Sequence, residues 1–205
     1  MDKAALERRL SAVSGFESPR IELEQYPTPA DLAAHLVHLA AVQGDLADQT
    51  VADLGTGTGM LALGAACGRP ARAVGIDRDA AALATARENE RAVEPAVAVD
   101  WVLGDATRPP LALSDATVLM NPPFGAQSGN EHIDRAFLQA AAEIAGVSYS
   151  IHNAGSEAFV EAFAADEGGE VTHAFRAEFP LARQFDHQTS EREVVDAEVF
   201  RIRWR

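Results

Sequence analysis

Four consecutive residues, Asn121, Pro122, Pro123 and Phe124, offer acceptors for the hydrogens of an amino group beside an aromatic ring. The apolar run before them, 118–120, is typical of a buried strand. Proline donates no backbone hydrogen bond and pushes the preceding residue out of the helical region, so the chain must leave the sheet at Asn121. The amide, the carbonyls and the aromatic ring are then expected at the carboxyl end of the strand, which is where open α/β sheets bind ligands. A strand-ending turn with a core phenylalanine explains the same residues equally well.

Aspartates follow three other predicted strands. Asp53 precedes a glycine turn, 55–59, and Asp77 and Asp105 end the next two strands. Asp77 lies 18 residues beyond Gly59, a spacing at which a carboxylate meets ribose hydroxyls. The turn reads G-x-G-x-G, and an NAD or FAD site stays possible. Asp53, however, would repel a pyrophosphate and attract a cation. S-adenosylmethionine carries an ammonium and a sulfonium and no phosphate, so it fits the three carboxylates better.

Strands and helices alternate along the chain in a way that brings these turns to one edge of a sheet. Five strands alternating with helices predict an α/β fold with a doubly wound sheet, and two later segments predict an antiparallel hairpin. No linker interrupts the pattern, so we expect a single domain over 1–205. The expected helices are 4–14, 31–43, 60–67, 79–91, 131–145 and 156–165, and the expected strands are 50–54, 73–77, 97–103, 118–120, 147–151, 171–179 and 193–204.

The composition is strongly acidic, with 31 acidic against 17 basic residues and Lys3 as the only lysine. A hydrated acidic surface keeps proteins soluble in salt, so we interpret the charge as adaptation to a salt-rich cytoplasm. A G+C-rich genome explains the arginines but not the net charge of −14. Cys67 is the only cysteine, which excludes an internal disulfide and a multi-cysteine zinc site. With no signal peptide and no membrane-length apolar run, we expect a cytoplasmic protein.

The motifs resemble those of class I S-adenosylmethionine-dependent methyltransferases that act on an exocyclic nitrogen. More specifically, the chain resembles the methyltransferase-like protein five family of ribosomal RNA adenine-N6 methyltransferases, in a haloarchaeal form. That family often has cysteines where Thr56 and Thr58 stand. The segments that carry the resemblance are Gly15-Phe16-Glu17, Leu23-Glu24-Gln25-Tyr26-Pro27-Thr28, Met120-Asn121-Pro122-Pro123-Phe124-Gly125, Tyr149-Ser150-Ile151-His152 and Val195-Asp196-Ala197-Glu198.

The resemblance implies a Rossmann-like fold whose mostly parallel sheet has seven strands, with an antiparallel C-terminal strand. Residues 1–30 would form a helix and a loop that covers the cofactor, with Gln25 and Thr28 closing over its methionine end. We expect no metal; the pair His35 and His38 suits a helix surface better than a metal site. The cofactor-binding residues implied are Gln25, Thr28, Asp53, Gly55, Thr58, Gly59, Met60, Asp77, Asp105, Ala106 and Asn121.

The expected reaction is SN2 methyl transfer to N6 of an adenosine in small-subunit ribosomal RNA. The Asn121 amide oxygen and the Pro122 carbonyl would accept the two N6 hydrogens, with Pro123 completing the rigid loop. Phe124 would stack on a base extruded from its helix or already unpaired, and Tyr26 would line the substrate entrance. Positioning is expected to provide most of the catalysis.

RNA binding usually relies on basic patches, which this acidic chain lacks. The C-terminal third is its most basic part, and we interpret those arginines, 176, 183, 201, 203 and 205, as a scattered solvated face. The resemblance implies a heterodimer with a small zinc-binding activator protein. The strand Val97–Leu103 would lie at the sheet edge, where a partner strand could pair or this chain's own helices could shield it.

Two other functions stay open. A protein glutamine-N5 methyltransferase acting on a release factor would use the same loop, because a side-chain amide resembles adenine N6 in its hydrogen bonds. Phe124 favours adenine, since release-factor enzymes more often have tyrosine there. A non-catalytic RNA-binding or ribosome-assembly module is the other alternative, and the intact set of Asp53, Asp77, Asp105 and Asn121 argues against it.

Overall fold

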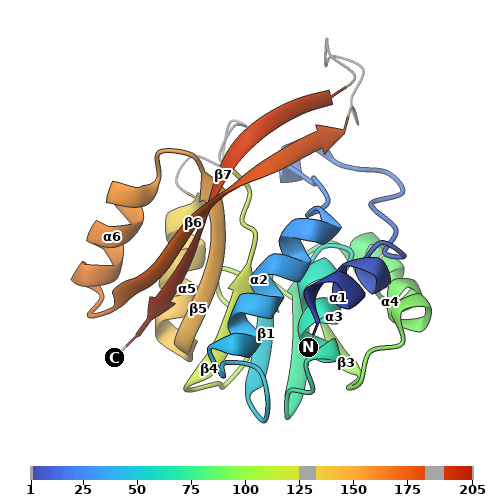
Figure 1. Cartoon of the computed structure of the whole chain (residues 1–205), viewed down its shortest axis with the longest axis horizontal. Helices are drawn as coiled ribbons and strands as arrows, with labels where there is room; N and C mark the ends of the chain where they lie inside the picture. Colours follow the sequence, from blue (N-terminus) through green and yellow to red (C-terminus); the bar gives the residue numbers. More distant parts are fainter. Residues whose placement is uncertain (1, 125–132, 183–191, 205) are drawn as a thin grey trace.

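The computed structural model describes residues 2–124, 133–182 and 192–204, and these form a seven-stranded sheet (Figure 1). Its strand order is β3-β2-β1-β4-β5-β7-β6. Strands β1 to β5 are parallel, and β7 is antiparallel to both β5 and β6. The predicted doubly wound, mostly parallel sheet with an antiparallel C-terminal strand is confirmed. The strands are β1 Thr50–Leu54, β2 Arg72–Asp77, β3 Val99–Leu103, β4 Ala116–Met120, β5 Ala145–Asn153, β6 Glu170–Ala182 and β7 Arg192–Arg203.

Helices cover both faces of this sheet (Figure 1). Buried side chains of α1, α2 and α3, such as Leu10, Leu36 and Leu63, form the core on one face. Phe137 of α5 and Phe163 of α6 belong to the core on the other face. The helices are α1 Lys3–Leu10, α2 Ala30–Val42, α3 Met60–Cys67, α4 Ala80–Val93, α5 Ile133–Ile144 and α6 Glu157–Asp166, with a short 3-10 helix, η1 Ile21–Leu23, that the sequence did not predict.

Some boundaries differ from the predicted ones, and tertiary contacts explain the differences. Helix α1 ends at Leu10 rather than near residue 14. The chain leaves the helix there, and the Asn89 side chain accepts from the Ser14 N–H and donates to the Ser14 carbonyl. Strand β3 begins at Val99, because the N–H of Val97 bonds outside the sheet to the Ala66 carbonyl. The predicted first turn of α5, 131–132, and Gly125 lie outside the described residues.

The arginines of the C-terminal third follow the expected solvated face in part, because the side chains of Arg176 and Arg203 are 77% and 61% exposed, whereas Arg201 departs from it. Arg201 is only 9% exposed and is paired with Asp45 at 2.8 Å. Arg203 pairs with Glu170 at 2.9 Å, and Arg176 reaches Glu198 at 3.4 Å. The interpretation was wrong for Arg201, because its guanidinium is buried and is stabilised there by the carboxylate of Asp45. Arg183 and Arg205 lie outside the described residues.

Strand β3 lies at the edge of the sheet, as predicted from the usual strand order. Trp101 turns inward from this strand, and a Cβ added to Gly59 or Gly75 would lie 2.7 Å or 2.6 Å from its ring. Leu103 at the strand end is 61% exposed. On α2, His35 stacks on Phe175 with ring centroids 4.5 Å apart. Within the described ranges, we find no helix with the length and apolarity to cross a bilayer.

Candidate active site

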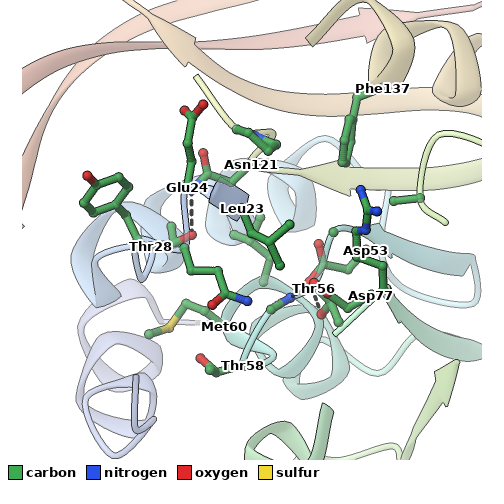
Figure 2. A pocket seen from close by; sticks show the side chains of 18 of the residues that line it. Leu23, Glu24, Thr28, Asp53, Thr56, Thr58, Met60, Asp77, Asn121 and Phe137 are labelled. Atoms are coloured by element: carbon green, nitrogen blue, oxygen red, sulfur yellow. Dashed lines mark hydrogen bonds between the residues drawn. The ribbon is translucent and has the colours of Figure 1, made fainter. Parts of the chain in front are cut away.

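A pocket of about 200 Å³ opens at the carboxyl ends of β1, β2 and β4, beneath the loop that leads into α2 (Figure 2). Most of the residues predicted to bind the cofactor or the substrate line it. These are Gln25, Tyr26, Thr28, Asp53, Gly55, Thr58, Met60, Asp77, Asp105, Ala106, Asn121 and Pro123. Gly59, Pro122 and Phe124 are not among the lining residues.

Hydrogen bonds to Asp53, in β1, stabilise the glycine turn between β1 and α3. Oδ2 of Asp53 accepts from the Thr56 hydroxyl at 2.6 Å and from the Ala62 N–H at 2.9 Å (Figure 2). Burial raises the pKa of Asp53 to about 7, against the opposing effect of these hydrogen bonds. One oxygen of this carboxylate is therefore used by the turn itself, a contact that the sequence did not predict.

Positive φ angles let the turn approach the pocket closely. Gly55, Gly57 and Gly59 have φ values of 70°, 55° and 92°, which other residues adopt only with strain. A Cβ on Gly57 would lie 2.9 Å from the Phe16 ring, and one on Gly55 would lie 3.0 Å from Phe137. Gly59 instead precedes α3 and packs under Trp101, so it serves the turn without facing the pocket.

Two further carboxylates complete this wall of the pocket. Asp77 accepts from the N–H groups of Gly57 and Asp79, each at 2.8 Å, and its burial raises its pKa. Asp105 is exposed and accepts from the Thr107 hydroxyl at 2.7 Å and from the Thr107 N–H at 2.9 Å, which lowers its pKa. Asp77 thus fixes the glycine turn, while Asp105 faces the solvent side of the pocket.

The loop between η1 and α2 is fixed over the pocket by Asp79, the first residue before α4. Asp79 accepts from Gln25 Nε2 at 2.6 Å and pairs with Arg20 at 2.8 Å. Gln25 Oε1 in turn accepts from the Arg20 N–H at 2.8 Å. The side chain of Gln25 therefore fixes the loop in its position over the pocket through these hydrogen bonds. It also lines the pocket.

Asn121 has an unusual hydrogen-bond arrangement at the end of β4. Its Nδ2 donates to the Thr28 hydroxyl at 2.9 Å (Figure 2). Its Oδ1 is buried and accepts no hydrogen bond from any group in the described parts of the chain. A buried acceptor without a donor costs about 1–3 kcal/mol, so such a group is retained where something else supplies the donor. Thr28 thus binds the amide nitrogen of Asn121 and leaves its oxygen without a donor among the described residues.

Phe124 and Pro122 lie on a second, smaller cavity on the other side of the loop, of about 20 Å³. Phe124 is half-buried and packs against the core on the α1–α3 face. Its carbonyl accepts from Asn153 Nδ2 at 3.3 Å. The predicted stacking of Phe124 on a base is not tested by this geometry and stays a prediction.

Other pocket residues had no predicted role, and some of them are brought there by tertiary packing. Phe137 enters from α5, across the sheet from Met60 (Figure 2). No spacing in the sequence relates Phe16 or Phe137 to the glycine turn. Thr56 and Gly57, in contrast, lie within the turn itself. The full set is Phe16, Leu23, Glu24, Pro27, Thr56, Gly57, Leu61, Arg78, Thr107, Ile133 and Phe137.

The chemistry of this pocket fits S-adenosylmethionine better than a dinucleotide. Asp53, Asp77 and Asp105 line one wall, and carboxylates favour a cationic ligand over a pyrophosphate. The glycine turn brings backbone close to the ligand space, and the Asn121 oxygen, which has no donor in the described parts of the chain, marks where one is expected. Among the residues that the structure describes, no group of three or more His, Cys, Asp or Glu could hold a metal ion.

Comparisons with known proteins agree with this chemistry. Residues 30–146 match the model of the methyltransferase small domain family. The rRNA N(6)-adenosine-methyltransferase Mettl5 of Drosophila melanogaster is 35% identical over 96% of this chain and 95% of its own length. An uncharacterized protein of Methanocaldococcus jannaschii is 33% identical over 98% of this chain and 93% of its own.

A solved structure extends the comparison to three dimensions. The crystal structure of a candidate RNA methyltransferase from Pyrococcus horikoshii matches with a TM-score of 0.89 and 34% identity, covering 100% of this chain and 98% of that one. The fold is thus the Rossmann-like class I methyltransferase fold that the sequence predicted. By sequence, structure and the geometry of its pocket, the chain belongs to the methyltransferase small domain family and, within it, to the METTL5 family.

Proposed function

We propose that this protein transfers a methyl group from S-adenosylmethionine to N6 of an adenosine in the RNA of the small ribosomal subunit. The relatives of the METTL5 family are named rRNA N(6)-adenosine-methyltransferases, and they cover nearly the whole chain. The observation that carries the proposal is the buried oxygen of Asn121, a residue that lines the pocket, because this oxygen has no donor among the described residues. Adenine N6 carries two hydrogens and can supply that donor.

S-adenosylmethionine supplies a methyl group activated by the positive sulfonium. We assign its binding to the predicted residues that line the pocket, with Asp53, Asp77 and Asp105 favouring its positive charges. Gln25 and Thr28 hold the covering loop in place through Asp79 and Asn121. Gly59 acts through the shape of the turn, since it does not line the pocket.

The role of the Asn121 loop is to orient the target nitrogen. In this proposal Asn121 Oδ1 and the Pro122 carbonyl accept the two N6 hydrogens, which directs the nitrogen lone pair toward the methyl group. The nitrogen becomes acidic as its new bond to carbon forms, so water can take the proton and no strong base is needed. Orientation of this kind can contribute about 7–11 kcal/mol in favourable cases. Phe124 stacks on the adenine, and Tyr26 lines the entrance.

We further propose that a small zinc-binding activator protein pairs with the edge strand β3, as the family resemblance implies. Leu103 on this strand and Val42 on α2 are the exposed large hydrophobics of the described chain, at 61% and 67%. They therefore make a matched pair of probes. Leu103→Glu should weaken co-purification with the activator, whereas Val42→Glu should not. Equal retention of the activator by both variants would contradict this docking site.

The acidic surface supports a proposal about working conditions. A net charge of −14 opposes RNA binding, and molar salt shortens the screening length to about 3 Å. We propose a halophilic, cytoplasmic enzyme whose activity is highest in concentrated KCl. A titration of methyl transfer against KCl decides it, because best activity at low salt would contradict this adaptation.

The function itself is tested by transfer of labelled methyl from S-adenosylmethionine, with the activator present and absent. The acceptors are small-subunit RNA, large-subunit RNA and release factor, and the products are identified by mass spectrometry. We expect N6-methyladenosine in small-subunit RNA alone. Label in large-subunit RNA would revise the substrate, and N5-methylglutamine in release factor would replace the proposal. Cofactor binding without transfer to any acceptor would favour a non-catalytic assembly role.

A further inference from the structure

His152 is a buried polar residue that the proposed reaction does not yet use. It lies at the end of β5, is 2% exposed, and meets the ring of Phe200 edge-on at 5.8 Å. Its Nε2 is buried and makes no hydrogen bond within the described parts of the chain. Burial lowers the pKa of His152 to about 4, so the imidazole is neutral under ordinary conditions. A neutral ring can offer Nε2 either as an acceptor or as a donor.

His152 also lines the smaller cavity, together with residues 122–124 of the loop that follows Asn121. The cavity measures about 20 Å³ and is bordered by Pro122, Pro123, Phe124 and Asp134. One buried water needs about 10–15 Å³ and two to four polar partners. The residues around the cavity include the polar side chains of His152 and Asp134 and the carbonyl-bearing prolines of the loop, so enough polar groups are near it to hold one water.

The sequence of the loop explains why such a water is needed. Asn121 is fixed by Thr28 at one end, and the Phe124 carbonyl is fixed by Asn153 at the other. Pro122 and Pro123 between them have no N–H, so hydrogen bonds can hold this middle part only through its carbonyls. Carbonyls accept hydrogen bonds, and the group that faces them must therefore donate. Water carries two donors and can also bond to Nε2.

We propose that His152 is a positioning residue, which through one water in this cavity holds Pro122 and Pro123 and so keeps Asn121 in its reactive orientation. The proposal rests on the proposed methyl transfer. It assigns His152 no contact with the cofactor or with the reacting atoms, since His152 does not line the main pocket.

The variants that test it are His152→Leu, which removes both nitrogens, and His152→Gln, which can restore a polar group near the position of Nε2. Ser150→Ala is the matched control. Ser150 lies two residues earlier on the same face of β5 and is fully buried. Its Oγ also has no hydrogen-bond partner among the described residues, but Ser150 does not line the cavity. A merely structural effect of losing a buried polar atom would affect both sites alike.

Single-turnover methyl transfer should fall about a hundredfold in His152→Leu, the effect expected when a reacting group is misplaced by about 1 Å. The dissociation constant for S-adenosylmethionine should not change. His152→Gln should recover much of the rate, and Ser150→Ala should match the wild type. A His152→Leu enzyme as fast as the wild type, or one whose loss is equalled by Ser150→Ala, would overturn the proposal.

A second readout does not depend on activity. A high-resolution crystal structure of the wild type should contain one ordered water bonded to His152 Nε2 and to a loop carbonyl. A cavity without water, or an Nε2 bonded directly to the loop, would overturn the proposal even if the enzyme is active. A wild-type protein that methylates no RNA would refute the proposed function, whereas the water would still decide whether His152 holds the loop.

Discussion

Two groups of buried polar side chains lie near opposite ends of β4, and they differ in how completely their hydrogen bonds are satisfied. Near the strand's start, Asp45 bonds to Arg201 through both oxygens, at 2.8 and 3.1 Å, and to Tyr149 at 2.5 Å. Its carbonyl also accepts from Thr117, the second residue of β4. At the strand's end, Asn121 has one partner, Thr28, and an amide oxygen with none among the described residues.

This difference separates a structural polar network from a functional one. The Asp45 network has little left to offer a ligand, because its charged groups are paired with each other. The amide of Asn121 keeps an acceptor that no donor among the described residues satisfies. Unsatisfied buried groups are rare in folded proteins, and each one needs an explanation. In the proposed reaction the target amino group supplies the missing donor, and perturbing the two groups should therefore change different properties.

The largest expected effect is on stability. Arg201→Ala should lower the free energy of unfolding by about 3–5 kcal/mol, since it leaves the Asp45 carboxylate without its buried partner. Chemical denaturation measures this, and calorimetry on the folded variant should give an unchanged dissociation constant for S-adenosylmethionine. A variant of normal stability, or one that loses cofactor affinity while folded, would break the comparison.

The next effect is on catalysis. Asn121→Ala should reduce the methyl-transfer rate about a hundredfold to a thousandfold, as is found when one preorganised hydrogen-bonding group is removed from an active site. Its free energy of unfolding should fall only by about 0.5–1.5 kcal/mol, for the lost hydrogen bond from Nδ2 to Thr28, and S-adenosylmethionine should still bind. Turnover at the wild-type rate would remove the central role given to Asn121.

A smaller effect concerns pH. The pKa of Asp53 is raised to about 7 by burial, so its carboxyl is mostly neutral below that pH and ionised above it. A cationic ligand binds the ionised form better, so affinity for S-adenosylmethionine should rise with pH, by at most about tenfold per unit. Titration calorimetry from about pH 6 to about pH 8 checks this. Asp53→Asn should show a flat profile, and a flat wild-type profile would refute the interaction.

The smallest effect belongs to an exposed ion pair on the same strand as Arg201. Arg203 and Glu170 are 61% and 58% exposed, so Arg203→Ala should change the free energy of unfolding by about 0–1 kcal/mol. The same denaturation experiment that measures Arg201→Ala provides the comparison. A loss as large as that of Arg201→Ala would mean that burial is not what distinguishes the two arginines.

The sequence predicted the parts of this molecule that local chemistry determines. Proline geometry predicted that the chain leaves the sheet at Asn121, directly after the last residue of β4, and hydrophobic periodicity located the strands and helices. It could not show that Asp53 holds its own glycine turn, or that Phe16 and Phe137 meet that turn, because these contacts join elements far apart in the chain. The same reason explains Arg201, whose partner Asp45 lies 156 residues away.

The central claim is that the free oxygen of Asn121 receives the target amino group. A crystal structure with S-adenosylhomocysteine and an adenosine-containing RNA target tests it most directly. We predict that adenine N6 lies about 2.7–3.2 Å from Asn121 Oδ1, with Nδ2 still donating to Thr28. An adenine whose N6 is held elsewhere, or an Asn121 oxygen that takes its hydrogen bond from the protein, would contradict the account.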